Sequence, residues 1–515
     1  MSVTSLRLAE LVAALSIATD LGLGHPMERA LRVCLLSVRI GEMLGLNERE
    51  LSDTYYVALL RFAGCAADAL HRASIFGDEI ALGPTMDAPE LWKPWPMLSA
   101  IVKHAGEGLP PLPRTQMIAR SLVMGIARSE AAAVANCEVA ESIASRLGLG
   151  EGVQRGLLQV FERWDGRGVP GKAKGEQLTL PSRITQLAQT VELYGRLGGI
   201  EAALGVAQQR AGGHFDPSLV ERFCRAAPQL LQIYDVESCW QTTLDLEPGT
   251  RQHLMGEQID EAVRAIADFS DLRLPWMVGH STAVSQLAEA AARNLKLSEA
   301  DVVLVRRAAL IHDVGAVSTS VSVWNKAGKL SDSEWERVRL HPYYTERIVA
   351  RSPALAPLGA LAMAHHERLD GAGYHRQLPA SMLSPAARIL AVAEAYQAMS
   401  EARPYRVALM PAQAADELRR EAKAGAWDGE VVNAVLSAAG HKIPRARRAS
   451  PVGLSEREVE VLRLLAGGLS NKQMAQQLVV SPATIDHHIR HIYNKVGCST
   501  RIAATLFAMQ HRLIE

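Results

Sequence analysis

Apolar residues recur every three or four positions through most of this chain. The pattern runs over residues 1 to about 240 and is clearest at 27–44 and 137–149, and such a period places the apolar side chains on one face of a helix. Residues 6–23 are also strongly apolar but contain Arg7, Glu10 and Asp20, which fits neither a signal peptide nor a membrane-spanning helix. The pattern therefore predicts an all-α protein, which we expect to be cytoplasmic and without a membrane partner.

Length and composition bound the number of domains and the class of partner. With 515 residues, the chain is expected to form about three domains. Its formal net charge is zero, so any affinity for nucleic acid must come from local basic patches rather than from the field of the whole molecule. The six cysteines are scattered without CxxC spacing, which is typical of reduced thiols and not of a disulfide framework.

The most unusual stretch is 364–374, where two adjacent histidines precede an acid and paired glycines. With histidines and acids on neighbouring helical segments it gives a set of candidate metal ligands: His280, His312, Asp313, His341, His365, His366 and Glu394. Imidazoles dominate this set, and they suit iron, zinc, manganese or nickel better than magnesium or calcium. Seven donors suit two metals that share ligands, an arrangement that activates a bridging water for hydrolysis of a phosphate ester.

Positions within this set predict individual roles. His365 and His366 are adjacent and cannot both point to one side of a helix, so we expect them at a helix end. Asp313 is expected to bridge the metals, because its two oxygens can reach both. Any one of these histidines alone is more often a hydrogen-bonded or surface residue than a ligand, and it is the ordered series that favours metal binding.

The ordered motifs resemble the HD-GYP branch of the HD phosphohydrolases over roughly residues 255–440. The matching residues are His312-Asp313, His341-Pro342, His365-His366 and the segments 325–330, 370–374 and 403–406. The resemblance implies hydrolysis of cyclic di-GMP or a related phosphoester at two divalent transition metals, iron or manganese, with catalytic roles for His312 and Asp313. It also implies that Arg403, Arg406 and Tyr374 contact ligand phosphates, which guanidinium groups suit; surface charge is the alternative role for the two arginines.

Four departures from the family pattern bear on catalysis more than on binding. Ala316 stands where the family has a lysine, whose ammonium would stabilise phosphate charge, and Glu394 replaces the usual aspartate. His375 stands in place of the proline of the family signature. Trp276 replaces an acid that binds a third metal in some members, which favours two metals over three. Slow phosphodiesterase activity and ligand sensing without turnover therefore both remain open.

The first half of the chain resembles the second, as expected for an internal repeat. Gly64 corresponds to Gly315, 251 residues later, whereas Asp165 corresponds to Asp370, only 205 residues later. The first copy therefore has an insertion of about 46 residues, which we place in the proline-rich stretch 83–114 as an irregular excursion.

The first copy lacks the metal ligands of the second. Their positions are taken by Arg61-Phe62, Asn136, Val160-Phe161 and Gln189, and His25 is expected to be the one retained ligand, opposite His280. Apolar and cationic groups cannot bind a metal pair but can fill the space of a lost site. The sequence thus predicts a degenerate, metal-free HD-type domain at 1–245 and a metal-competent HD-type domain at 246–443.

The C-terminal segment 453–515, after a basic linker at 444–452, resembles a LuxR-type helix-turn-helix of four helices. Helix-start signals support the resemblance. Ser455 and Glu458 predict a capping box on the first helix. Ser470 is placed to cap the second helix, and Ser481 is followed by Pro482 at the start of the third, where a missing N–H costs nothing.

The third helix of this module is expected to enter the major groove of double-stranded DNA, with Ile485, Ile489 and Ile492 on its inner face. The residues expected at the DNA are Lys472, Thr484, Asp486, His487, His488, Arg490 and Lys495. Asp486 replaces a lysine of the family and either accepts from a cytosine amine or turns away from phosphate. Because the module is only mildly basic, we expect a homodimer on paired half-sites.

Domain order leads to two hypotheses of different class. In the first, the protein is a DNA-binding transcription regulator whose metal-binding domain senses or slowly hydrolyses a cyclic dinucleotide or related phosphoester. In the second, it is an active metal-dependent cyclic di-GMP phosphodiesterase that uses the helix-turn-helix for localisation. Ala316 favours the first hypothesis, and a pure scaffold is disfavoured because the second copy retains its histidines.

Overall fold

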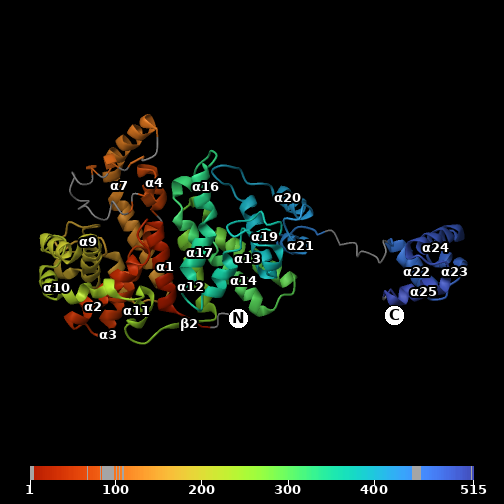
Figure 1. Cartoon of the computed structure of the whole chain (residues 1–515), viewed down its shortest axis with the longest axis horizontal. Helices are drawn as coiled ribbons and strands as arrows, with labels where there is room; N and C mark the ends of the chain where they lie inside the picture. The colour runs from red at the N-terminus through yellow and green to blue at the C-terminus, as the bar shows by residue number, and fades with distance from the viewer. Residues whose placement is uncertain are drawn as a thin grey trace. The chain divides into compact units, whose positions relative to one another are not determined.

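The computed structural model describes residues 5–66, 68–81, 83, 98–99, 101–103, 105–106, 110–443, 454–511 and 513–514. Nearly every element is a helix (Figure 1), which confirms the predicted all-α fold. The chain forms two compact units, residues 1–441 and 442–515. The predicted linker at 444–452 lies outside the described residues. No described helix is long and apolar enough to cross a bilayer.

The segments predicted as two HD-type domains both lie in the first unit; η denotes a 3-10 helix. The first half contains β1 (Ser5–Arg7), α1 (Leu8–Gly22), α2 (Arg29–Leu44), α3 (Glu48–Leu60), η1 (Ala63–Ala66), α4 (Ala69–Phe76), α7 (Pro111–Arg146), α8 (Glu151–Leu158), η2 (Gly175–Gln177), α9 (Leu180–Gln209), α10 (Pro217–Leu230), η3 (Leu231–Asp235) and α11 (Cys239–Asp245).

The second half has a similar order of helices. It contains β2 (His253–Met255), α12 (Glu257–Asp271), η4 (Pro275–Met277), α13 (His280–Asn294), α14 (Glu299–Ile311), η5 (Val314–Ser318), α15 (Val321–Trp324), α16 (Asp332–Arg339), α17 (His341–Val349), α18 (Ala356–Ala362), η6 (Ala380–Met382), α19 (Pro385–Ser400), α20 (Pro411–Lys423) and α21 (Gly429–Ala438). The second unit contains α22 (Glu456–Ala466), α23 (Asn471–Gln477), α24 (Pro482–Val496) and α25 (Arg501–Gln510).

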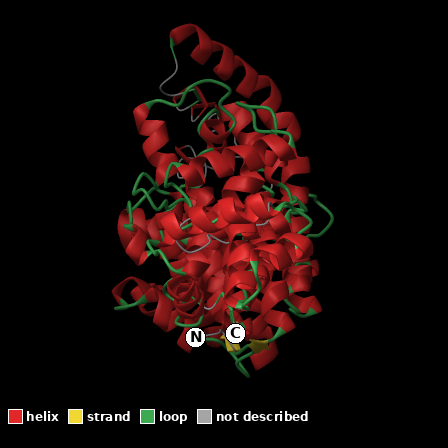
Figure 2. Ribbon diagram, turned by 90° about the vertical axis from the view of Figure 1, so that its right-hand side faces the viewer, coloured by secondary structure: helices red, strands yellow, loops and turns green. Residues whose placement is uncertain are grey.

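Helix α1 lies at the centre of the first unit. All its residues except Glu10 and Leu21 are buried, and a helix that is buried all round needs neighbours on every side. It packs against α2 and α3 of the first repeat and against η5 and α17 of the second. One hydrophobic core therefore contains side chains of both repeats. The short strands β1 and β2, yellow in Figure 2, pair antiparallel beside it and join the start of the chain to the segment between the repeats.

Constant spacing of the helices supports the internal repeat. Helices α3 and α14 each have 13 residues and begin 251 residues apart, at Glu48 and Glu299. Helices α9 and α19 begin 205 residues apart, at Leu180 and Pro385. The close packing at the two glycines matches as well. A Cβ on Gly64 would lie 1.7 Å from the carbonyl oxygen of Asn136, and one on Gly315 would lie 2.1 Å from that of His341. The insertion therefore lies between Gly64 and Asn136.

One predicted correspondence is wrong, because His25 is not the counterpart of His280. Helix α13 begins at His280, and its second N–H donates to Asp271 at 3.0 Å. Helix α2 begins at Arg29, and its second N–H donates to Asp20, also at 3.0 Å. Asp20 and Asp271 are 251 positions apart, and so are Arg29 and His280, the first residues of the two helices. Arg29 therefore occupies the position of His280. The Gly-His-Pro motif that suggested His25 lies in the turn before α2.

The turn after the paired-histidine position is built in the same way in both repeats. Glu367 is buried, and its carboxylate accepts from the backbone N–H groups of Arg376 and Leu378 at 2.8 and 2.9 Å. Glu162, also buried, accepts from residues 171–173. A carboxylate that accepts several N–H groups fixes a loop without any metal, so the first repeat retains the scaffold of the site although it lacks the ligands.

The predicted irregular excursion at 83–114 is flanked by helices, and most of its residues lie outside the described ones. Helix α7 begins at Pro111, so the last four residues of the predicted irregular stretch are helical. Helix α4, which precedes the excursion, packs against α15 of the second repeat. The insertion of the first repeat therefore contacts the second.

Gly315→Ala should destabilise the first unit by about 3 kcal/mol, because the new Cβ would overlap the carbonyl of His341 and force η5 away from α17. Urea denaturation measures the change. Gly205→Ala is the matched control, because a Cβ added to this helical glycine would have no atom within 4 Å and alanine favours a helix by about 1 kcal/mol. Equal stability of the two variants would contradict the close packing at Gly315.

Candidate metal centre and DNA-binding module

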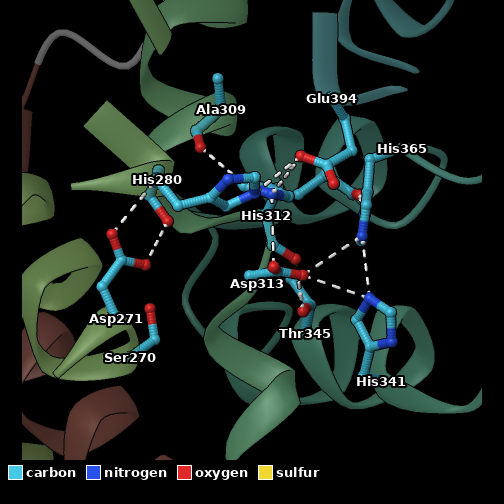
Figure 3. A network of polar contacts seen from close by, with 12 residues as sticks. Ser270, Asp271, His280, Ala309, His312, Asp313, His341, Thr345, His365 and Glu394 are labelled. Carbon is cyan, nitrogen blue, oxygen red and sulfur yellow. Dashed lines mark hydrogen bonds and ion pairs between the residues drawn. The ribbon is translucent and has the colours of Figure 1, made fainter. Parts of the chain in front are cut away.

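All seven predicted metal ligands lie together in the second repeat, and six of them are visible in Figure 3. They come from five helices: His280 begins α13, His312 and Asp313 follow α14, His341 begins α17, His365 and His366 follow α18, and Glu394 lies within α19. The paired histidines therefore lie just beyond a helix end, as predicted. All but His366, which is half-buried, are buried.

The seven donors form two groups of three with one carboxylate between them. In the first group, His280, His312 and Glu394 each place a ligand atom within 4.8 Å of the others. In the second, His341, His365 and His366 do the same. Two groups of this size fit two metal ions better than one.

Asp313 faces both groups. Its Oδ2 lies 3.5 Å from Nε2 of His312, while its Oδ1 lies 3.2 Å from Nε2 of His341 and 3.3 Å from Nε2 of His365. A carboxylate whose two oxygens point to different groups is placed to bridge two ions. The geometry thus supports the bridging role predicted for Asp313.

Three of the histidines are oriented by the same main-chain device. His312, His341 and His365 each donate their Nδ1–H to the carbonyl three residues earlier, at 2.7, 2.6 and 2.6 Å. Because a carbonyl only accepts, this bond places a proton on Nδ1 and turns Nε2 of each ring toward the centre, where Nε2 of His341 and Nε2 of His365 lie 2.9 Å apart. Metal-binding histidines are commonly oriented by such a second bond.

His280 is oriented by an acid that the sequence did not single out. Its Nδ1 lies 2.8 Å from Oε2 of Glu401, while its Nε2 lies 2.9 Å from Oε2 of Glu394. Glu401 follows Glu394 by seven residues and comes directly after the last residue of α19. That spacing was the signal available in the sequence.

The approach of imidazoles and carboxylates shifts their pKa values in opposite directions. Burial alone would raise the pKa of Asp313 and Glu394, but the neighbouring imidazoles hold both pKa values well below their usual range. Burial alone would lower the pKa of His280 and His312, but the carboxylates raise both. Burial and the neighbouring imidazoles instead lower the pKa of His365 and of His366. A bound metal ion would take the place of any proton on the donor nitrogens.

Four buried atoms point into the centre without a hydrogen bond of ordinary geometry. They are Nε2 of His280, Nε2 of His312, Oδ1 of Asp313 and Oε2 of Glu394. Buried polar atoms are nearly always paired, so such a set calls for a cation. Imidazole nitrogens and carboxylate oxygens in this number fit divalent transition metals. The residues present therefore fit two ions, one in each group.

An aromatic pocket of about 590 Å³ lies beside the ligand cluster. Its lining includes Trp324, Trp335 and Tyr405, together with Lys326 and Lys329. The ring of Trp324 lies 5.7 Å from that of His341, so the pocket is next to the second group of donors. This pocket was not predicted from the sequence, although three aromatic residues near the candidate ligands were an available signal in a chain with few aromatics.

The residues predicted to contact ligand phosphates have different surroundings. The guanidinium of Arg403 lies 4.4 Å from the ring centre of Trp276. Tyr374 stacks on His366 with ring centres 4.5 Å apart. Arg406 instead donates to main-chain carbonyls at the end of α19. Nη2 of Arg403 also lies 2.9 Å from Oε2 of Glu401, the acid that contacts His280. Arg403 and Tyr374 therefore lie beside the metal centre, whereas the contacts of Arg406 are those of a helix cap.

In the first repeat, a cation and aromatic rings occupy the equivalent space. The guanidinium of Arg61 lies 5.1 Å from the ring centre of Phe62 and 6.0 Å from that of Phe161. Arg29 approaches the buried Glu192 at 3.5 Å. Among the described residues, the groups of three or more potential ligands all lie in the second repeat. The first repeat thus fills its centre with its own side chains.

The second unit has the helix starts that the sequence predicts. Ser455 and Glu458 form a capping box on α22, in which each side chain accepts from the other's N–H. The side chain of Ser470 accepts a hydrogen bond from the N–H of Gln473 at the start of α23. The side chain of Ser481 accepts from the N–H of Thr484 at the start of α24, where Pro482 is the first helical residue. The four helices share a small core.

Helix α24 has a buried face and a polar face. Ile485, Ile489 and Ile492 are buried, as predicted. Of the predicted DNA-facing residues, Lys472, Asp486, His487, Arg490 and Lys495 are exposed, and Thr484 and His488 are half-buried. Asp486 accepts from the side-chain amide of Asn471 at 3.0 Å, a contact that fixes α24 against α23. Neither alternative considered for Asp486 included this contact.

Two family models match the chain. The model of the HD domain matches residues 130–219 and 264–431, so both repeats contribute to the match. The model of bacterial regulatory proteins of the luxR family matches residues 452–508. The chain belongs to the HD-domain family and carries, in addition, a luxR-type helix-turn-helix.

Its relatives include phosphodiesterases of cyclic dinucleotides. The 3'3'-cGAMP-specific phosphodiesterase 3 of Vibrio cholerae is 32% identical over 417 residues, which are 78% of this chain and 88% of that protein. A crystal structure of a cyclic GMP-AMP specific phosphodiesterase of V. cholerae matches with a TM-score of 0.59 and 30% identity, covering 85% of this chain and 99% of that chain. The nitrate/nitrite response regulator protein NarP of Escherichia coli is 48% identical over 59 residues, 12% of this chain and 27% of that protein.

His365→Ala should abolish the metal content of the protein. The imidazole of His365 belongs to the second group of donors and also lies 3.3 Å from Asp313, the carboxylate that faces both groups. Elemental analysis of anaerobically purified protein measures the change from an expected two ions per chain. His25→Ala is the control, because His25 is also buried but lies against Phe62 in the first repeat. Two ions retained in His365→Ala would exclude the site.

The second unit should lose stability between about pH 4.5 and pH 2. Burial alone would raise the pKa of Glu458, but Lys495 and the N–H of Ser455 lower it from 4.5 to about 2. A lowered folded-state pKa gives stability that is present above pH 4.5 and lost as the pH falls. Hydrogen exchange of residues 456–510 should show better protection than in Glu458→Gln at pH 6 and a much smaller difference near pH 2. A difference as large at pH 2 as at pH 6 would contradict this account.

Proposed function

We propose that the second repeat binds two divalent transition metal ions, iron or manganese, and hydrolyses a phosphodiester bond of a cyclic dinucleotide, and that the C-terminal module binds double-stranded DNA. One observation carries the first part of the proposal. Seven buried or half-buried donors converge in two groups that share the carboxylate of Asp313. Centres of this kind suit in-line hydrolysis of phosphate esters.

The substrate class follows from the relatives and from the pocket beside the metal centre. Relatives named as phosphodiesterases of 3'3'-cGAMP and of cyclic di-GMP match this chain. The pocket has two tryptophans and a tyrosine, and aromatic side chains stack on nucleobases with about 1–3 kcal/mol per base. A cyclic dinucleotide supplies both a phosphate for the metal ions and a base for this pocket.

The side chains of the chain have separate tasks in this reaction. When bound, the two ions would supply positive charge at the scissile phosphate and lower the pKa of a water between them. His312 and Asp313 hold the two donor groups together and are the proposed catalytic pair. Arg403, held on Trp276, is placed to donate to a phosphate oxygen.

Ligand sensing without turnover is the second candidate, and one residue favours it. Ala316 is buried, and its carbonyl accepts from the indole N–H of Trp324 at 3.3 Å. The ammonium that the family places here is therefore absent, and with it a source of charge stabilisation worth several kcal/mol in a dry site. Slow turnover or none is the expected consequence.

Metal analysis combined with a turnover assay tests the proposal. The wild-type chain should contain about two iron or manganese ions and convert cyclic di-GMP or 3'3'-cGAMP to a linear dinucleotide. Asp313→Asn should abolish turnover, because the neutral amide cannot bridge two cations, while circular dichroism stays unchanged. Metal with ligand binding but no turnover would support the sensor instead, and no metal at all would exclude both.

The DNA-binding part of the proposal includes a homodimer. Helix α25 exposes Ile502, Leu506 and Met509, whose exposed fractions are 83%, 55% and 60%. These residues recur at helical spacing on one face, which suits a contact with the same helix of a second copy. A dimer doubles the basic surface presented to paired half-sites. A DNA target would place the protein in the cytoplasm.

Arg490→Ala should weaken the affinity for DNA and lower the salt dependence of binding by about one phosphate contact, because Arg490 is exposed on the polar face of α24. Fluorescence anisotropy at several salt concentrations measures both quantities. Arg463→Ala is the matched control, since it removes an equal charge from α22. The same titration with and without cyclic di-GMP tests whether ligand in the first unit alters DNA affinity, as the domain order suggests.

A further inference from the structure

A buried carboxylate of the first repeat contacts the segment that follows the His312-Asp313 pair. Glu79 is 1% exposed and lies in the insertion that distinguishes the first repeat. Its Oε2 accepts from the hydroxyl of Ser320 at 2.7 Å, and its Oε1 accepts from the N–H of Val321 at 2.8 Å. Its Oε1 also lies 3.0 Å from Nη2 of Arg273, whose Nη1 donates to the carbonyl of Val317 at 2.7 Å.

The insertion contacts both helices that carry the tryptophans of the aromatic pocket. Glu79 binds the first residue of α15, the helix that ends at Trp324. The adjacent Asp78 lies 3.3 Å from the guanidinium of Arg337 on α16, the helix of Trp335. Helix α4 completes the contact, because its side chains form a small core with Val321 and Trp324.

Helix α15 depends on these contacts for its position. It has four residues, and an isolated helix of that length is not stable in water. Its first N–H and the side chain of Ser320 are both held by Glu79. A shift of α15 would move Trp324 away from the ring of His341, 5.7 Å distant, and would alter the pocket.

We propose that Glu79 is a positioning residue for the aromatic pocket of the second repeat, contributed by the repeat that has no metal ligands. This proposal rests on the proposed function, in which the pocket takes a base of a cyclic dinucleotide. The first repeat then sets the affinity of the site for its ligand without touching the ligand. Its insertion holds α15 and α16, and with them Trp324 and Trp335, in the arrangement that a base can enter.

A second buried ion pair of the first unit provides a matched control. Arg7 and Glu247 are 2.6 Å apart, and their side chains are 9% and 1% exposed. Both pairs are charged and buried, and breaking either one leaves an unpaired buried charge, which is strongly destabilising. Of the two carboxylates, Glu79 contacts α15, whereas Glu247 binds Arg7 and the hydroxyl of Tyr56.

Glu79→Gln should raise the Kd for cyclic di-GMP about tenfold, since small displacements of a binding group have effects of this size or larger. Isothermal titration of metal-loaded full-length protein measures the Kd. KM should rise by the same factor, while kcat changes less than twofold and the metal content stays at two ions per chain. Glu247→Gln should lose comparable thermal stability and leave Kd and KM unchanged. Equal Kd and KM for Glu79→Gln and wild type, with stability lost, would falsify the proposal.

The double variant Glu79→Leu/Arg273→Met guards against misfolding of the single variant. Replacing a buried ion pair by apolar groups is often neutral for stability, but it still removes the contacts to Ser320 and Val321. It should show the same rise in Kd as Glu79→Gln. A double variant that folds and binds cyclic di-GMP as tightly as wild type would overturn the proposal.

A measurement without ligand separates this proposal from the proposed function. Acrylamide quenching of Trp324, obtained as the difference from Trp324→Phe, should increase in Glu79→Gln because α15 is released. If wild-type protein binds no cyclic dinucleotide, the proposed function fails, yet quenching still decides the role of Glu79. Unchanged quenching of Trp324 would show that Glu79 does not position α15.

Discussion

Two buried carboxylates, Asp313 and Glu394, impose the main constraint on the second repeat. An ionised carboxylate is costly to bury unless cations and hydrogen bonds surround it, and here imidazoles converge on the pair from four helices. Such convergence needs helix ends that are fixed to within fractions of an ångström, and the Nδ1 bonds of the histidines to main-chain carbonyls provide part of that accuracy. The packing of both repeats around α1 holds the helices themselves.

The first repeat shows which parts of this architecture do not depend on metal. The buried Glu162 still holds its loop, and Gly64 still allows the close approach of α7. The centre differs: Arg61 stacks on aromatic rings where the second repeat gathers its donors. A scaffold stabilised by a shared core and by main-chain hydrogen bonds therefore remains folded when the ligands are replaced by groups of sufficient volume.

The sequence predicted the features that depend on local order along the chain. The all-α fold, the helix caps of the C-terminal module and the seven converging residues could be read from periodicity and from the order of His312, Asp313 and the paired histidines. The equivalence of His25 with His280 was wrong, because a short motif was preferred over the constant spacing that identifies Arg29. The contact of Glu79 with Arg273 could not be predicted, since it joins residues 194 positions apart.

The shared core around α1 has a consequence for how such a chain can evolve. After a duplication, two copies with separate cores can be lost independently by deletion. Here α1 packs against both copies, and the strand before it pairs with the segment between them. Deleting the first copy would expose the apolar side of the second. Mutation can therefore remove the chemistry of the first copy residue by residue, while selection for a soluble second copy preserves its helices.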